Sequence, residues 1–367
     1  MEKTDLEFVD RIFQESVPYS GSLELTHRCN LACRHCYQFS PGDRSELGTG
    51  QWMKVMQELA SAGCLFLAFT GGEPLLREDL PELIRAAAAM RYAITLQTNA
   101  VLLGEADARM LGDMPTVRVD VSVYGARPET HDRLTGMRGS FAATRRALEL
   151  LRENGVPVLL KVTVGDFNFG EIEDIALMAD GLGVKAVFSS LIFPRNDRDA
   201  APTSLRLEDA ELERFIDFDA RYMLDNMGEL MGVDAGELAY PDLVDYLHKC
   251  AIDPARVRSE HRRYCGGGST VFAINPYGDV YPCVAFPLVV GNILQYSFVE
   301  IWKKSPELLR LRAQEDELPR ECRECDLLDR CAICRALSFL EGGEAMAFSR
   351  ERCRQTRALV KVLADEG

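Results

Sequence analysis

Short β-like runs alternate with helical runs from residue 20 onward, and this alternation restricts the fold more than any other feature. Neighbouring parallel strands need a helical crossover between them, and such crossovers are right-handed. Six strand-helix units are too few for a closed eight-stranded barrel. The pattern therefore predicts an α/β fold, a partial (β/α)6 TIM-like barrel whose chemistry lies at the carboxyl ends of its strands. The predicted strands are Ser22–Leu25, Cys64–Phe69, Tyr92–Gln97, Val117–Val123, Pro157–Val164 and Lys185–Ile192.

Helical segments separate the predicted strands. The first has Thr49 as its predicted N-cap and turns Trp52, Met56 and Leu59 to one face, which we assign to the core. The others lie at about Asp79–Met90, Glu105–Leu111, Ser140–Asn154 and Gly170–Leu182. The chain after residue 195 becomes polar, then acidic and helical, and finally rich in cysteine. We therefore expect an N-terminal segment (1–20), the barrel (21–195), a helical bridge (196–262) and a Cys-rich domain (263–367).

Composition excludes several classes of protein. With 47% apolar and 27% charged residues, the chain has the composition of a soluble globular protein. A net charge of -15 argues against a nucleic-acid partner, because a phosphate backbone would be repelled. The acidic N-terminus lacks a signal peptide, and no apolar run is long enough to cross a membrane. We expect a cytoplasmic protein with no membrane partner, whose 12 cysteines are thiols that bind metal.

Three cysteines follow the first strand directly, in a C-x3-C-x2-C pattern formed by Cys29, Cys33 and Cys36. A structural zinc site uses four protein ligands. A cubane iron–sulfur cluster held by three thiolates instead leaves one iron open to another ligand. The alternative is a zinc knuckle that takes His27 or His35 as its fourth ligand.

A second motif ends the second strand, where Gly71, Gly72, Glu73 and Pro74 spell GGEP. Together the two motifs resemble the radical S-adenosylmethionine (SAM) superfamily over about residues 21–193, although His35 stands where that family usually has an aromatic residue. The resemblance implies a [4Fe-4S] cluster that cleaves SAM to a 5'-deoxyadenosyl radical, which abstracts hydrogen from a substrate. It also implies an electron donor such as flavodoxin or ferredoxin.

The resemblance further implies which side chains contact SAM. Glu73, or the carbonyl groups near it, would hold the ammonium group, with the glycines allowing close approach. Asn99 and Ser122 would face the ribose and carboxylate, although a turn or strand-end role is an equal alternative. Tyr37 would lie against the adenine or pack in the core. Lys161 would point into the barrel lumen or out to solvent.

The C-terminal cysteines form a second array, with Cys265 and Cys283 flanking a predicted hairpin that turns at residues 276–279. The order of the array resembles the SPASM domain, which binds up to two auxiliary [4Fe-4S] clusters. Two residues separate Cys331 from Cys334, where that family usually has three. The resemblance assigns Cys322, Cys325, Cys331 and Cys353 to the distal cluster, and Cys265, Cys283 and Cys334 to the nearer one.

The nearer cluster is one ligand short in this assignment. Cys250, a non-cysteine group or an open iron would complete it. Zinc is the alternative for the whole array, because paired C-x2-C units also bind zinc. Cys64 we assign to the core.

The substrate class follows from resemblance to subfamilies. Val284 stands where sulfatase maturases have an Asp that acts as a base, so that activity is disfavoured. Residues 124–136 and 139–141 resemble enzymes that modify ribosomally made peptides, although His131 is also explained as a polar residue in the first turn of a helix. We therefore expect a maturase that modifies or cross-links a precursor peptide, brought by a separate leader-recognition protein or by the N-terminal segment.

Two alternatives remain. One is a cofactor-biosynthesis enzyme that acts on a tetrapyrrole, similar to the haem d1 maturases, or on a peptide-derived cofactor. The other is an iron–sulfur electron carrier, which has no need of the GGEP motif. No catalytic side chain is assigned from the sequence.

Overall fold

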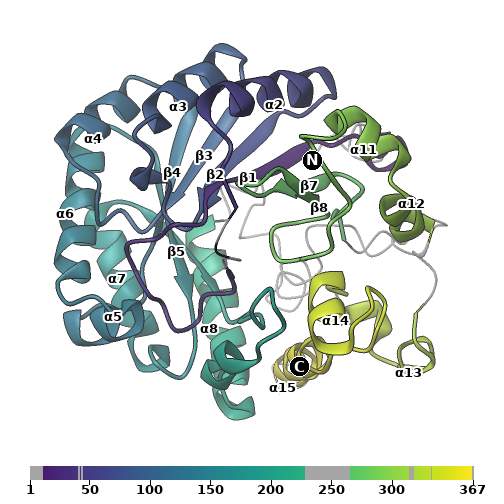
Figure 1. Ribbon diagram of the computed structural model, residues 1–367. Helices are drawn as coiled ribbons and strands as arrows, with labels where there is room; N and C mark the ends of the chain where they lie inside the picture. The colour runs from purple at the N-terminus through teal and green to yellow at the C-terminus, as the bar shows by residue number, and fades with distance from the viewer. Residues whose placement is uncertain are drawn as a thin grey trace.

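Six parallel strands form the centre of the protein in the computed structural model, which describes residues 11–39, 42, 44–227, 265–313, 318–331 and 333–365. The sheet order is β6-β5-β4-β3-β2-β1-β7-β8-β9 (Figure 1). The predicted partial barrel is confirmed, and each of its strands lies within three residues of the predicted bounds. The six strands are β1 (Ser20–Thr26), β2 (Phe66–Gly71), β3 (Ala93–Thr98), β4 (Val117–Ser122), β5 (Val158–Thr163) and β6 (Lys185–Ser189).

The two faces of the sheet differ in polarity. Leu23, Leu25 and Phe69 are fully buried in the hydrophobic core, where the helices form an outer layer (Figure 1). Because side chains alternate along a strand, the residues between them point to the inner face. That face is polar, with Glu24 of β1 paired in register with Thr70 of β2. The outer helices are α2 (Thr49–Ser61), α3 (Leu80–Ala89), α4 (Glu105–Gly112), α5 (Pro128–Thr135), α6 (Ser140–Glu153) and α7 (Ile172–Leu182).

The start of α2 differs from the prediction. Gly48, not Thr49, is the N-cap, and the Gln51 side chain accepts a hydrogen bond from the Gly48 N–H at 2.9 Å. The Thr49 hydroxyl instead donates to Asp79 at 2.6 Å. The prediction of Thr49 as a cap was wrong because this partner lies about 30 residues away in the chain.

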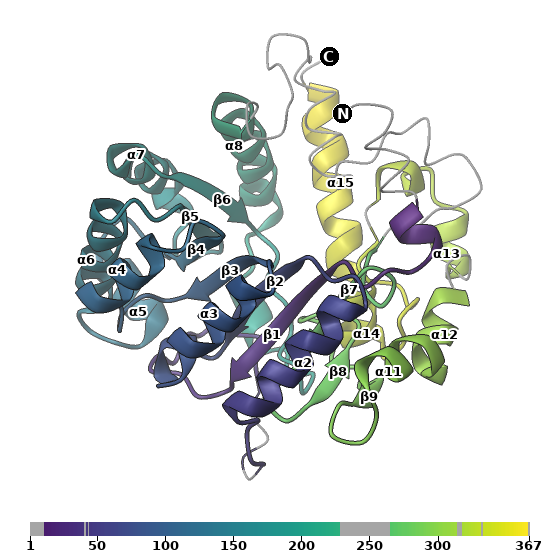
Figure 2. The same ribbon diagram turned by 90° about the horizontal axis from the view of Figure 1, so that it is seen from above.

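The C-terminal hairpin joins the barrel sheet. Strands β7 (Val271–Ile274) and β8 (Asp279–Tyr281) pair antiparallel, as the sequence predicts, and β9 (Gly291–Asn292) follows. However, β7 also pairs parallel with β1, as Figure 2 shows. Gly21 permits this contact, because a Cβ there would lie 2.2 Å from the ring of Phe272. The Cys-rich segment thus extends the barrel sheet, which the sequence did not predict.

The remaining described helices follow the barrel. Helix α8 (Asp209–Met227) begins within the predicted bridge and packs against α15. Residues 228–264, including Cys250, lie outside the described part of the chain. Of the helices in the described ranges, none is both long and apolar enough to span a bilayer. The C-terminal helices are α11 (Phe298–Lys304), α12 (Pro306–Ala313), α13 (Arg320–Arg323), α14 (Arg335–Gly342) and α15 (Arg350–Asp365).

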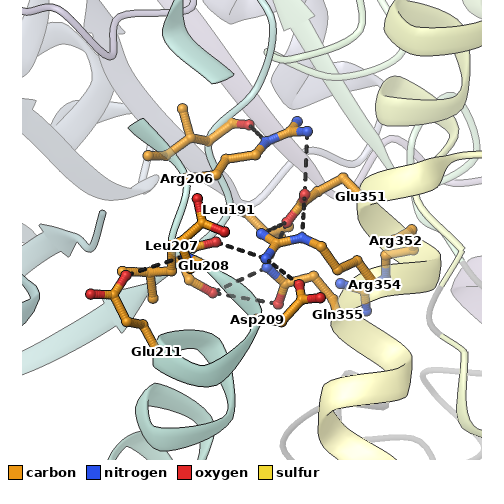
Figure 3. A network of polar contacts seen from close by, with 12 residues as sticks. Leu191, Arg206, Leu207, Glu208, Asp209, Glu211, Glu351, Arg352, Arg354 and Gln355 are labelled. Carbon is orange, nitrogen blue, oxygen red and sulfur yellow. Dashed lines mark hydrogen bonds and ion pairs between the residues drawn. The ribbon is translucent and has the colours of Figure 1, made fainter. Parts of the chain in front are cut away.

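A buried polar network fixes α15 against the segment that leads into α8 (Figure 3). Glu351 is 2% exposed and pairs with Arg206 at 3.2 Å and with Arg354 at 3.0 Å. Arg354 also donates to the Leu207 carbonyl at 2.7 Å. Gln355 bonds both Glu351 and Ser190, which directly follows β6. Since breaking a buried ion pair is strongly unfavourable, the network holds the orientation of α15 relative to the barrel.

Candidate functional site

The GGEP turn lies directly on the cysteine loop. The N–H of Gly72 donates to the Thr26 carbonyl at 2.7 Å, and that of Glu73 donates to the Arg28 carbonyl at 2.9 Å. A Cβ on Gly72 would lie 2.1 Å from the Arg28 oxygen. Gly71 has φ +127°, and its Cβ would lie 2.2 Å from the Thr26 oxygen. Both positions therefore require glycine, and the two motifs form one structural unit.

The three thiols of the cysteine loop are neighbours at the mouth of the barrel. Burial raises the pKa of the Cys33 thiol to about 12, and the thiols of Cys36 and Cys29 also raise it. Among the described residues, no three His, Cys, Asp or Glu side chains converge as ligands of a single metal ion. The thiolates of a cubane cluster bind separate iron atoms and do not converge on one point. Three neighbouring thiols that do not converge are therefore compatible with such a cluster.

The two histidines of the zinc alternative have other contacts. His35 packs its ring against Tyr124, with centroids 4.6 Å apart, and stacks on Phe167. Nε2 of His27 lies 3.3 Å from a carboxylate oxygen of Glu24. Each ring thus has a contact other than a metal, while Nδ1 of each histidine is buried with no partner among the described residues.

Glu73 clamps the ends of two strands together. It is fully buried and accepts hydrogen bonds from the Thr98 hydroxyl at 2.6 Å, the Asn99 N–H at 2.8 Å and the Leu75 N–H at 3.0 Å. Burial raises the pKa of its carboxyl group, while these three bonds lower it in part. The carboxylate therefore orders the turn beside the cysteine loop, and its contact with the SAM ammonium stays a prediction.

We predict that Glu73→Gln weakens SAM binding about 10- to 100-fold without loss of cluster iron. The amide nitrogen cannot accept a hydrogen bond, so one charge-assisted bond worth about 1.5–3 kcal/mol is lost. Equilibrium binding of SAM and iron content measure the two effects. Glu82→Gln, an exposed position on the neighbouring α3, is the charge-matched control. Loss of iron from the Glu73 variant would indicate a folding role, and unchanged affinity would assign the ammonium to carbonyl groups alone.

The structure places the other predicted SAM contacts at the inner face and its edge. Asn99 follows β3 and donates to the Asn30 side chain at 2.9 Å, which links β3 to the cysteine loop. Ser122 and Lys161 are register partners on β4 and β5. Lys161 therefore points to the inner face, beside Ser122 and opposite in direction to the buried Leu160. This resolves the choice that the sequence left open.

Tyr37 directly follows Cys36, and its carbonyl accepts a hydrogen bond from the Asn196 N–H at 2.8 Å. Burial raises the pKa of its hydroxyl, and the charges of Glu24, Cys36 and Cys283 also raise it. Cys36 belongs to the first array and Cys283 to the second. The hydroxyl is therefore within electrostatic range of a thiol from each array, while the contact of Tyr37 with adenine stays a prediction.

The structure brings the C-terminal thiols together in two sets. Burial raises the pKa of the Cys322 thiol, and three neighbouring thiols raise it further. These three belong to Cys325, Cys331 and Cys353. They line a cavity of about 350 Å³, which Cys334 also borders.

The second set surrounds Cys283. Burial raises the pKa of its thiol, and the thiols of Cys265 and Cys334 raise it as well. These are the same two groups that the family resemblance implies. Cys64, by contrast, is 3% exposed within the core, as predicted.

Sequence reasoning missed several residues at this site. Glu24 is 3% exposed and accepts a hydrogen bond from Gln38 at 2.7 Å. Arg44, beyond the cysteine loop, forms an ion pair with Asp279 of the C-terminal hairpin. The sequence signal for Glu24 was its charge, which is unusual inside a predicted strand. No local signal existed for the Arg44 pair, because its partner is more than 200 residues away.

Comparison with known proteins identifies the family. The radical SAM superfamily matches residues 23–179, and an iron–sulfur cluster-binding SPASM domain matches residues 265–326. An AdoMet-dependent heme synthase of Methanosarcina barkeri is 30% identical over 91% of this chain and 95% of its own. The mycofactocin maturase MftC of Mycobacterium ulcerans is 31% identical over 89% of this chain and 85% of its own. A PqqA peptide cyclase of Rhizobium meliloti is 28% identical over 84% of this chain and 80% of its own.

Solved structures show the same fold. Streptococcus suis SuiB bound to S-adenosylmethionine superposes with a TM-score of 0.68 at 17% identity, over 96% of this chain and 81% of that one. The radical SAM match contains the first cysteine array, and the SPASM match begins at Cys265 of the second array. The chain therefore belongs to the radical SAM superfamily and carries a C-terminal SPASM domain.

Proposed function

We propose that this enzyme is a peptide maturase that removes hydrogen from a ribosomally made precursor peptide and so modifies or cross-links it. The observation that carries the proposal is a cavity lined both by Phe39, three residues after Cys36, and by Val284, the residue next to Cys283. One cavity thus adjoins the segments that carry the two cysteine arrays. A substrate in that space lies beside one cluster site for hydrogen abstraction and beside a second site for the electron that an oxidative modification releases.

The family's cofactors are SAM and [4Fe-4S] clusters, which when bound supply the 5'-deoxyadenosyl radical and an electron acceptor. The residues of the chain hold and shield them. We propose that Cys29, Cys33 and Cys36 ligate the SAM-binding cluster. We assign the distal auxiliary cluster to Cys322, Cys325, Cys331 and Cys353, and the nearer one to Cys265, Cys283 and Cys334. The fourth position of the nearer cluster belongs to Cys250, to a non-cysteine group or to an open iron.

The substrate class rests on the relatives. A peptide cyclase and a maturase each match more than four fifths of this chain. The second candidate is a tetrapyrrole enzyme, favoured by the heme synthase match that covers 95% of that relative. For either substrate we propose action in the cytoplasm with a flavodoxin or ferredoxin as electron donor. For a peptide substrate, we also propose a separate leader-recognition protein as a partner.

The test supplies both substrate classes to reconstituted enzyme with SAM and dithionite. A small precursor peptide encoded beside the gene should lose hydrogen, seen by mass spectrometry, in step with formation of 5'-deoxyadenosine. An iron tetrapyrrole with propionate side chains should remain unchanged. Conversion of the tetrapyrrole without change to the peptide would replace the proposal by the second candidate.

We predict that anaerobically reconstituted protein carries on the order of 8 to 12 irons per chain and little zinc. The reason is that ten of the described thiols, all except that of Cys64, fall into three sets, each suited to its own cluster. Metal analysis after reconstitution measures this content. Stoichiometric zinc together with about 4 irons would contradict the auxiliary clusters.

A further inference from the structure

A second cavity, of about 190 Å³, opens beside Glu24 at the junction of β1 with the C-terminal hairpin. Its volume corresponds to about six water molecules, at about 30 Å³ each, which is room for the head group of a side chain. Val284 also lines it. Its polar lining consists of Glu24, His27, Arg44, Asn196, Asn275 and Tyr281.

The polar lining offers both donors and acceptors, and its strongest acceptor is the Glu24 carboxylate. Glu24 receives hydrogen bonds from Gln38 at 2.7 Å and from Nε2 of His27 at 3.3 Å. An ionised carboxylate has about four acceptor positions, so further ones remain. Nδ1 of His27 is buried with no partner among the described residues, and it is an acceptor when the ring is neutral with its proton on Nε2. Oδ1 of Asn196 is likewise buried without a partner in the described part of the chain.

The charged side chains of the lining also favour a cationic ligand. Arg44 is the one Arg or Lys side chain among the described residues that line the cavity, and it is already paired with Asp279. It also donates to the Tyr277 carbonyl at 3.3 Å. Of the lining residues, His27 is the one whose side chain contacts Glu24 at ion-pair distance, 3.3 Å, and no Arg or Lys of the lining pairs with this carboxylate. A buried carboxylate in that position is stabilised by a ligand that brings positive charge and N–H donors.

We propose that this cavity binds a cationic N–H donor of the substrate, the ammonium or guanidinium group of a lysine or arginine side chain in the peptide. The proposal rests on the proposed function and names the chemistry of its substrate. It also separates the two candidates, because the propionate groups of a tetrapyrrole are anionic and would be repelled by Glu24.

The position of the cavity gives this contact a consequence for the reaction. Glu24 accepts a hydrogen bond at 2.7 Å from Gln38, which is two residues from Cys36, so the carboxylate lies beside the loop of the first cysteine array. Tyr281, on its other side, is two residues from Cys283. A cationic side chain held here would anchor the peptide between the two arrays and select which neighbouring residue is modified. Glu24 is thus a specificity-determining residue in this proposal.

The test uses n-butylguanidinium and butyrate as probes of the full-length reconstituted protein, with binding followed by saturation-transfer NMR. n-Butylguanidinium should bind and butyrate should not. Glu24→Gln, which keeps the size of the side chain, should weaken the guanidinium probe about 10- to 100-fold, as expected for loss of a charge-assisted bond. Asn196→Ala should weaken it by a smaller factor, and Glu153→Gln, an exposed charge-matched control on α6, should leave it unchanged.

Two results would overturn the proposal. One is binding of butyrate as tight as that of n-butylguanidinium. The other is guanidinium binding that neither variant weakens. Circular dichroism checks that each variant folds. If Glu24→Gln does not fold, the effect of Asn196→Ala on guanidinium binding tests the proposal. Because the probes need no turnover, this outcome is separate from the substrate test: a peptide left unmodified by enzyme that binds the probe would refute the proposed function and not the cationic site.

Discussion

Replacement of Cys29, Cys33 and Cys36 together by Ala is expected to reduce SAM cleavage to background while the C-terminal sites keep their iron. The three thiols lie on the loop after β1, whereas the thiols around Cys322 and Cys283 come from residues 265–353. No ligand is shared between the first site and the others in our assignment. About 4 irons per chain should therefore be lost, with the remainder unchanged. Formation of 5'-deoxyadenosine with dithionite and metal analysis measure the two quantities.

Cys64→Ala is the matched control for this variant. Its thiol is buried in the core and donates to the Phe66 carbonyl at 3.4 Å, away from both arrays. It should keep full iron content and SAM cleavage. A triple variant that still produced 5'-deoxyadenosine would show that the catalytic assignment is wrong.

Gly72→Ala is expected to abolish measurable SAM binding and to lower the free energy of unfolding by about 3–5 kcal/mol. The added Cβ would lie 2.1 Å from the Arg28 carbonyl oxygen, and no side-chain rotation can relieve a contact with the backbone. The cysteine loop and the GGEP turn must move apart, which breaks the hydrogen bonds to the carbonyls of Thr26 and Arg28. Overpacking costs about 1–3 kcal/mol, and each lost bond about 1 kcal/mol. Urea denaturation and equilibrium SAM binding measure the effects.

Gly170→Ala tests whether the effect is specific to the turn. A Cβ on Gly170 would have no atom within 4 Å, and its φ is not positive. Stability and SAM affinity should both be close to those of the unchanged protein. If Gly72→Ala bound SAM normally, the two motifs would not form the single unit that the structure indicates.

The barrel was predictable from the sequence because its pattern is local. Each strand and its following helix carry their own hydrophobic period, so periodicity located all six strands. The pairing of β7 with β1 has no such signal, because it depends on packing between distant segments. Only the structure shows that Gly21 leaves room for the ring of Phe272.

The same distinction applies to the site. The cysteines and the GGEP motif were recognised because their spacing is short and specific. The sequence places Glu73 directly after the second strand, but it does not show that the carboxylate accepts three hydrogen bonds from the neighbouring turn and strand. Glu24 and the Arg44–Asp279 pair depend on loops that meet only in the folded state. Their roles could not be predicted because tertiary contacts determine them.

The pairing of β1 with β7 also affects how the protein is made. Ser20 pairs with Val271, so the edge of β1 finds this partner only after the ribosome has added about 250 further residues. At about 5–20 residues per second, that edge stays open for roughly 12–50 s of synthesis. An unpaired strand edge readily joins the edge of another chain. Nascent chains on neighbouring ribosomes are therefore at risk of association, and a shortened chain that stops before β7 should aggregate.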